Sequence, residues 1–163
     1  MKSLVALLGL AATSACAQNL APAWTVTTPK DAPAVLSFDG ADGVRAHFQC
    51  LRKSGQVSLD FEVGHRIADH KVGEVWVDAS SIAAPWPVSI VFAAGAYATT
   101  LRGQAEPTET ASTTRVKTEI ATAAPVIKAF AKSGAISFRV LNSAVSPGIA
   151  KPSGVRKFLA VCK

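Results

Sequence analysis

The sequence predicts a mainly β protein, either an antiparallel β-sandwich or a partly open barrel, with two short helices near the C-terminus. The main observation is the strict alternation of apolar and polar residues over 57–63, which is typical of a strand with one buried face. Several other segments alternate in the same way and are separated by Gly, Pro or Asp. Two segments in the final third instead space their apolar residues as a helix does.

Residues 1–17 are expected to be a secretory signal peptide. A basic second residue, a short apolar run and the small residues Ala15-Cys16-Ala17 are its typical features, and the short basic region favours a bacterial origin. We therefore expect residues 18–163 to form a single β-rich domain that is periplasmic or secreted. The alternative is a lipid anchor at Cys16, which would hold the protein in the envelope. The apolar run is shorter than the roughly 20 residues of a transmembrane helix, so none is expected.

Strands are predicted wherever this alternation recurs between turn residues. The predicted strands are residues 34–38, 44–51, 57–63, 72–78, 88–92, 97–102, 116–120 and 136–140. The run Asp39-Gly40-Ala41-Asp42-Gly43 has the residues of a hairpin turn between the first two of them. Residues 103–114 are polar and have no apolar period, so we expect an exposed loop there.

Two helices are expected after the last long strands. The first begins at Pro125 and ends before Gly134, and its apolar residues are Val126, Ile127 and Phe130. The second runs from about Ser153, as the N-cap, to Cys162. Its apolar residues recur at positions i, i+3, i+4 and i+7, and these are Val155, Phe158, Leu159 and Cys162. A terminal strand over residues 156–162 is the alternative.

Cys50 and Cys162 both lie on apolar faces of their segments, one in a predicted strand and the other in the last predicted helix. Two cysteines in an oxidising compartment predict a disulfide. The bond would enclose about 112 residues and contribute on the order of 4–5 kcal/mol in the loop-entropy account. Two free thiols in the core are the alternative. Metal binding by this pair is not expected, because neither has a second cysteine at two- to four-residue spacing.

The charge of the chain is unevenly distributed. Residues 115–163 contain nine Lys and Arg but only one acidic residue, Glu119, whereas residues 18–114 contain seven basic and ten acidic residues. This asymmetry favours an acidic partner, either an unknown protein or an anionic envelope component such as lipid headgroups. The alternative is a solvated basic surface that only aids solubility. Nucleic acid is not expected, because an exported protein seldom meets it and no nucleic-acid-binding motif accompanies the charge.

No nucleophile elbow, phosphate-binding loop or dinucleotide motif is present. Asp60 and Glu62 share a strand face and could act as an acid–base pair, although adjacent acids are also common on the wet face of a strand. His65 and His70 flank Asp69, but their spacing puts them on no shared helical face, and we expect them to be exposed. We therefore predict no catalytic residue, cofactor or metal.

Two tryptophans are candidates for ligand binding. Prolines on both sides hold Trp86 in an extended segment, where an exposed ring could bind a sugar or a peptide. Trp76 alternates with acidic residues and could join it in an aromatic patch. The alternative is that Trp86 covers the end of the sheet as part of the core.

Three stretches resemble known families. Trp24-Thr25-Val26 resembles the opening of the invasion-associated locus B family of small exported bacterial proteins. Residues 133–140 and 152–162 resemble the ending of that family, and they are also similar to type VI secretion accessory lipoproteins, which close with a strand, a loop and a helix that bears a late cysteine. The chain departs from the first family because it lacks a cysteine shortly after Trp24. The resemblance implies a β-rich envelope protein and transfers no site residue.

Together these features predict an exported bacterial protein that binds a partner in the envelope or outside the cell without catalysis. An inhibitor of a hydrolase belongs to this class, and its binding would weaken with salt. The alternative is a small periplasmic hydrolase that uses Asp60 or Glu62, or a metal-binding protein that uses His65 and His70.

Overall fold

The structure is a computed structural model that describes residues 23–40 and 44–163. Its strands are β1 (Ala23–Thr27), β2 (Ala34–Asp39), β3 (Arg45–Cys50), β4 (Gln56–Val63), β5 (His70–Val72), β6 (Val75–Val77), β7 (Trp86–Ala94), β8 (Tyr97–Pro107), β9 (Thr114–Ala121), β10 (Ser137–Val140) and β11 (Ser143–Val145). Its helices are α1 (Pro125–Ser133) and α2 (Pro152–Cys162). The predicted signal peptide, Cys16 and residues 41–43 of the predicted turn lie outside the described residues.

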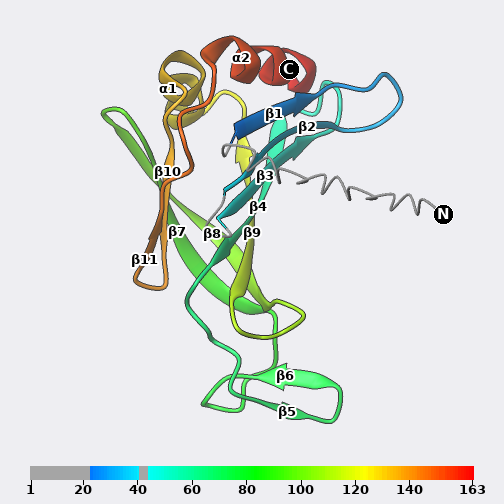
Figure 1. Ribbon diagram of the computed structural model, residues 1–163, viewed down its shortest axis with the longest axis vertical. Coiled ribbons are helices and arrows are strands. Elements are labelled where there is room, and N and C mark those ends of the chain that lie inside the picture. Colours follow the sequence, from blue (N-terminus) through cyan, green and yellow to red (C-terminus); the bar gives the residue numbers. More distant parts are fainter. Residues whose placement is uncertain (1–22, 41–43) are drawn as a thin grey trace, which may run out of the picture.

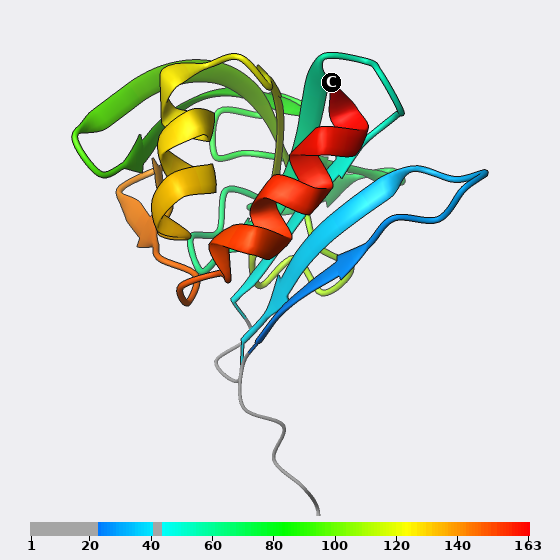
Figure 2. The same cartoon turned by 90° about the horizontal axis from the view of Figure 1, so that it is seen from above.

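Nine strands form one curled antiparallel sheet in the order β1-β2-β3-β4-β9-β8-β7-β10-β11, and β5 and β6 form a separate hairpin (Figure 1). The curl brings β11 into contact with β4, so the sheet resembles half of a barrel. α1 packs on β7 and β8, α2 packs on β1 and β2, and the two helices pack against each other. They cover one end of the half-barrel (Figure 2), and the β5–β6 hairpin projects from the opposite end. The prediction of a mainly β, partly open barrel is confirmed.

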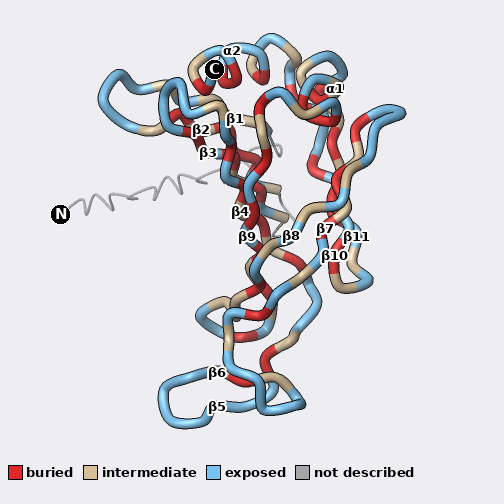
Figure 3. Tube along the Cα trace, turned by 180° about the vertical axis from the view of Figure 1, so that it is seen from behind, coloured by how far each residue is buried: buried red, intermediate tan, exposed pale blue. Residues whose placement is uncertain are grey.

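Alternation along the strands decides which face of the sheet is buried. In β4, Val57, Leu59, Phe61 and Val63 are buried, and the residues between them are exposed or half-buried. Buried residues of this kind follow the sheet beneath the helices, whereas the β5–β6 hairpin is mostly exposed (Figure 3). The polar face of β3, β4, β9 and β8 therefore points away from the core.

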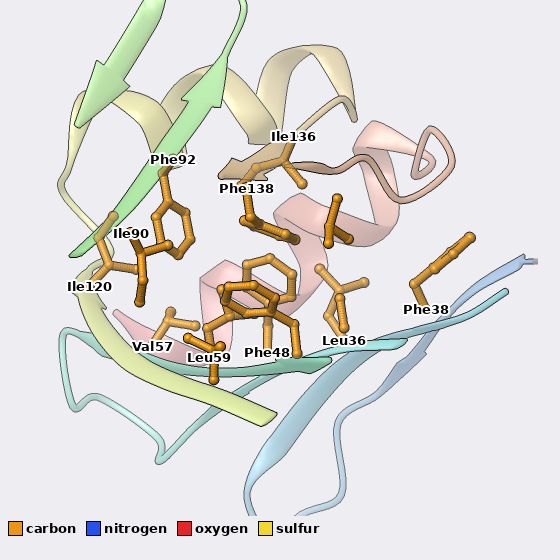
Figure 4. Close-up of a cluster of buried hydrophobic side chains, with 14 of the residues drawn as sticks. Leu36, Phe38, Phe48, Val57, Leu59, Ile90, Phe92, Ile120, Ile136 and Phe138 are labelled. Atoms are coloured by element: carbon orange, nitrogen blue, oxygen red, sulfur yellow. The ribbon is translucent and has the colours of Figure 1, made fainter. Parts of the chain in front are cut away.

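Aromatic rings fill the centre of the core, between the sheet and the helices (Figure 4). The Phe138 ring lies 4.8 Å from the Phe61 ring and 5.1 Å from the Phe92 ring, measured between centroids. The first contact connects β10 to β4 across the barrel interior, and the second joins β10 to its neighbour β7. Such aromatic pairs contribute about 0.5–1.5 kcal/mol beyond the burial of their surface.

Two sequence predictions about the strands are wrong. β8 continues to Pro107, so the expected loop over 103–114 is confined to residues 108–113. The inward positions of this strand end are the small residues Gly103 and Ala105, which do not register as an apolar period. The predicted strand 72–78 is the β5–β6 hairpin, because Gly73 turns the chain with φ 62°.

Both helices form where the apolar spacing predicts them. Pro125 opens α1, and Gly134 ends it in the left-handed conformation with φ 75°. α2 begins at Pro152 rather than after a Ser153 cap, and Lys151 is the N-cap residue without a side-chain cap. No helix among the described residues combines the length and apolarity that crossing a membrane would require.

Cys50 at the end of β3 and Cys162 in the last turn of α2 form a disulfide, as predicted, with their Cα atoms 5.6 Å apart. Two backbone hydrogen bonds lie beside it. The amide of Lys53 donates to the Val161 carbonyl at 3.0 Å, and the amide of Gly55 donates to the Cys162 carbonyl at 2.8 Å. The turn between β3 and β4 thus satisfies carbonyls at the C-terminal end of α2.

Candidate functional site

The two helices and the β3–β4 turn present one strongly basic surface. Its cations are all exposed, and we call them the basic face: Arg52, Lys53, Lys128, Lys132, Lys151, Arg156, Lys157 and Lys163. No Asp or Glu occurs in residues 51–55 or 120–163. The helical end of the half-barrel therefore carries eight cationic side chains and no acidic side chain from these segments.

Amphipathic helices direct the lysines away from the core. In α1 the buried residues are Val126, Ile127 and Phe130, so Lys128 and Lys132, one turn apart, are exposed on the opposite side. In α2 the buried residues are Val155, Phe158, Leu159 and Cys162. The exposed side of α2 then contains Arg156 and Lys157, and the exposed Lys163 is its C-cap residue.

The β3–β4 turn adds two cations that are far from the helices in sequence. Its hydrogen bonds to Val161 and Cys162 place Lys53 beside the last turn of α2. Arg52 donates through Nε and Nη2 to the carbonyls of Lys30 and Pro29, at 3.1 and 2.7 Å. The charge count over residues 115–163 missed both cations. The predicted bond between Cys50 and Cys162 is the sequence signal that could have placed this turn beside the helix.

The positive charge of the basic face is not neutralised locally. Among the described residues, none of its six lysines lies within 4.0 Å of a carboxylate oxygen. Arg156 instead donates from Nη1 to the Ala131 carbonyl at 3.3 Å and so connects α2 to α1. Uncompensated charges of one sign attract an oppositely charged surface, and salt screens that attraction.

Three cations of residues 115–163 lie outside the basic face: Arg139 is exposed on β10, and the other two are on β9. Arg115 and Lys117 are on β9, on the polar face of the sheet, and both have acidic partners. Lys117 Nζ lies 2.6 Å from Glu106 Oε2, and Arg115 lies 3.6 Å from Asp60 and from Glu62. The structure therefore separates the six cations that residues 115–163 contribute to the basic face from the two ion-paired cations on β9 and from Arg139 on β10.

Asp60 lines an open groove on this polar face, together with His47, Arg102, Lys117 and Glu119. Burial raises the pKa of Asp60 above its ordinary value, against the opposing influence of Arg115, Lys117 and His47. The groove contains cations and carboxylates side by side, so it offers no excess charge of either sign.

The histidines considered as metal ligands are exposed. His70 Nδ1 lies 3.0 Å from the carboxylate of its neighbour Asp69. Across residues 23–40 and 44–163, no three His, Cys, Asp or Glu side chains come together in a group that could hold a metal ion. Neither histidine has a geometry that favours the metal-binding alternative.

The structure buries Trp86, whose residue is 5% exposed and whose indole N–H donates to the Ile82 carbonyl at 2.9 Å. This is the arrangement of the structural alternative, in which Trp86 covers the end of the sheet. Trp76 is half-buried, and Lys71 Nζ lies 5.2 Å from the centroid of its ring. The two rings therefore do not form a jointly exposed patch.

No family model matches the sequence, and neither the curated proteins nor the solved structures give a match. The resemblance to locus B proteins and to type VI secretion lipoproteins stays a prediction. The basic face is a candidate site on the grounds of its geometry and its charge.

Proposed function

We propose that the protein is an exported, non-catalytic binding protein whose basic face binds an anionic component of the bacterial envelope. The observation that carries the proposal is the segregation of eight exposed cations on the helical end, with no Asp or Glu in the segments that bear them. A periplasmic or secreted location, with lipid anchoring as the alternative, is part of the same proposal.

Segregation of charge favours binding over a simple effect on solubility. A surface that only keeps a protein soluble intersperses both signs. This chain does so on the polar face of its sheet, where Arg115 and Lys117 have acidic partners. On the basic face the lysines have no such partners among the described residues. A single cation near an anionic surface contributes about 1 kcal/mol, so several together suffice for binding.

Catalysis by Asp60 and Glu62 receives less support. Arg115 lies between them, with Nε 3.6 Å from Asp60 Oδ1 and Nη2 3.6 Å from Glu62 Oε1. A guanidinium in this position pairs with both carboxylates at once. The arrangement is typical of a cross-strand ion pair on a sheet surface.

Substitution of three lysines tests the proposal. Lys128→Gln, Lys132→Gln and Lys157→Gln together remove three charges from the basic face. The matched control carries Arg45→Gln, Lys71→Gln and Arg102→Gln, which remove the same charge from other surfaces. Binding is measured to dextran sulfate, to polyglutamate and to vesicles that contain phosphatidylglycerol, each at low and high salt.

We expect the protein to bind at least one of these probes and to release it at high salt. At about 1 kcal/mol per lysine, the helical variant should bind roughly a hundredfold more weakly. The control variant should stay within about threefold of the parent protein, since exposed charges away from the site contribute little. Equal weakening in both variants, or no binding to any probe, would contradict the proposal.

A further inference from the structure

The basic face has exposed apolar side chains at its edges. Among the described residues, six large apolar residues are exposed, and three of them lie at this end of the molecule: Leu51 at 65%, Tyr97 at 55% and Ile149 at 77%. The other three are on or next to the β5–β6 hairpin, at the opposite end: Val72, Val75 and Ile82.

Leu51 follows β3 and lies beside the C-terminal end of α2. It opens the β3–β4 turn, and its carbonyl accepts a hydrogen bond from the Ser54 amide at 3.2 Å. The preceding amide in the turn, from Lys53, donates to the Val161 carbonyl in α2. Leu51 and Lys53 therefore stand together beside the last helical turn.

Ile149 lies where the end of α1 meets the start of α2. The amide of its neighbour Ala150 donates to the Gly134 carbonyl at 2.8 Å, just after α1. Lys151 follows directly and is the N-cap residue of α2. Ile149 thus has the α1 terminus on one side and a lysine of the basic face on the other.

Tyr97 lies beside α1 and is the first residue of β8, directly after the turn that connects β7 to β8. It lines a hollow together with Pro125, Lys128, Ala129 and Lys132. Seen from above, the β7–β8 hairpin and the β3–β4 turn flank the two helices from different sides (Figure 2). The three apolar residues therefore mark separate edges of one lysine-rich surface.

We infer that the anionic component bound by the basic face is the surface of an anionic lipid bilayer, an inference that rests on the proposed function. Lysines bind the phosphates of the headgroups, while Leu51, Tyr97 and Ile149 enter the boundary between headgroups and acyl chains. A tyrosine suits that boundary because its ring is apolar and its hydroxyl is polar.

The spacing of the apolar residues favours a bilayer over the other anionic partners. A soluble polyanion would use the lysines and gain nothing from three exposed apolar side chains. A protein partner would use a contiguous apolar centre with a polar rim. Here the three apolar residues are separate from one another, and each has a lysine near it. A bilayer offers negative charge and hydrocarbon everywhere along its surface, so it can contact all three residues and their lysines at once.

Vesicle binding tests the inference with a matched pair of variants. The anchor variant carries Leu51→Ser, Tyr97→Ser and Ile149→Ser. The control carries Val72→Ser, Val75→Ser and Ile82→Ser at the opposite end. Both are compared with the parent protein for sedimentation with vesicles of phosphatidylglycerol and phosphatidylcholine, with pure phosphatidylcholine vesicles, and for binding to dextran sulfate. All three proteins carry the same N-terminus, verified by intact mass. A difference in binding between them is therefore due to the substituted residues.

We expect binding to the anionic vesicles and none to pure phosphatidylcholine. The anchor variant should bind the anionic vesicles at least tenfold more weakly and dextran sulfate equally well, and the control should bind both as the parent does. Dextran sulfate binding without vesicle binding, or vesicle binding that the anchor variant retains in full, would overturn the bilayer inference and leave the proposed function standing. If the parent protein bound none of the probes, the proposed function itself would be overturned.

Discussion

Cys50 and Cys162 connect the inward face of β3 to the last turn of α2 across 112 residues of sequence. The bond and the hydrogen bonds from the β3–β4 turn act on the same helical end. Both residues are buried, Cys50 at 4% and Cys162 at 0% exposure. Through this connection one end of the basic face is fixed to the sheet.

Loss of the disulfide should destabilise the protein strongly. A Cys50→Ser and Cys162→Ser variant loses the restriction that a long closed loop places on the unfolded chain, about 4–5 kcal/mol in the loop-entropy account. Urea unfolding should show a clearly lower midpoint for the variant, and the parent protein should shift equally after reduction. An unchanged midpoint after reduction, with free thiols confirmed by mass, would show that the bond adds no stability.

Trp86 should be a stability residue. Trp86→Ala removes a buried ring and a hydrogen-bond donor to Ile82, and we expect a loss of about 3–5 kcal/mol in the free energy of unfolding. Binding to anionic probes should not change, because Trp86 begins β7 and Tyr97 follows the turn at the other end of that strand. A variant that melts normally but binds less would reveal a ligand contact instead.

Gly134 should tolerate no side chain, because it has φ 75° and a Cβ there would collide with the Ala150 carbonyl. Gly134→Ala should lose about 3 kcal/mol, the left-handed conformation accounting for about 1–2 of it. Gly73→Ala is the matched control, since Gly73 has φ 62° and open space around it. It should lose only the conformational part. Equal unfolding midpoints for the two variants would mean that the loop before α2 adapts freely.

Much of the fold was predictable because one face of the sheet is buried and the other is exposed to solvent. Apolar and polar residues therefore alternate along its strands. β4 shows it in full, since each inward residue is apolar. Alternation is not visible in the sequence where packing requires a small inward residue. At Gly103 a Cβ would lie 2.5 Å from Ile90 Cδ1 and 2.5 Å from the Lys117 carbonyl oxygen, so no larger residue fits there. The sequence of this part of β8 therefore resembles that of a loop.

The candidate site was predictable only in part. Its helical lysines follow from the charge count and the apolar spacing, which the sequence contains. The contributions of Arg52, Leu51 and Tyr97 depend on which turns the fold brings beside the helices, and no local pattern records that. The count also included Arg115 and Lys117, whose acidic partners on β4 and β8 come from strand pairing.

The stability of the protein should depend on pH through Asp60. Burial raises the pKa of this carboxyl above 3.8, its ordinary value, so the folded state holds the proton more tightly than the unfolded state does. The stability that protonated Asp60 contributes is complete below pH 3.8 and is lost as the pH rises through the raised pKa. Asp60→Asn keeps the shape and cannot ionise, so it should avoid that loss.

Urea unfolding of both proteins between pH 3 and pH 8 measures this effect. The stability of Asp60→Asn relative to the parent should rise from just above pH 3.8 and level off once the folded carboxyl is fully ionised. Asp31→Asn, on the exposed β1–β2 loop, removes the same charge without relieving burial, and it should show no such rise. If the relative stability of Asp60→Asn instead fell with pH, the attraction of Arg115 and Lys117 would outweigh the burial of the carboxylate.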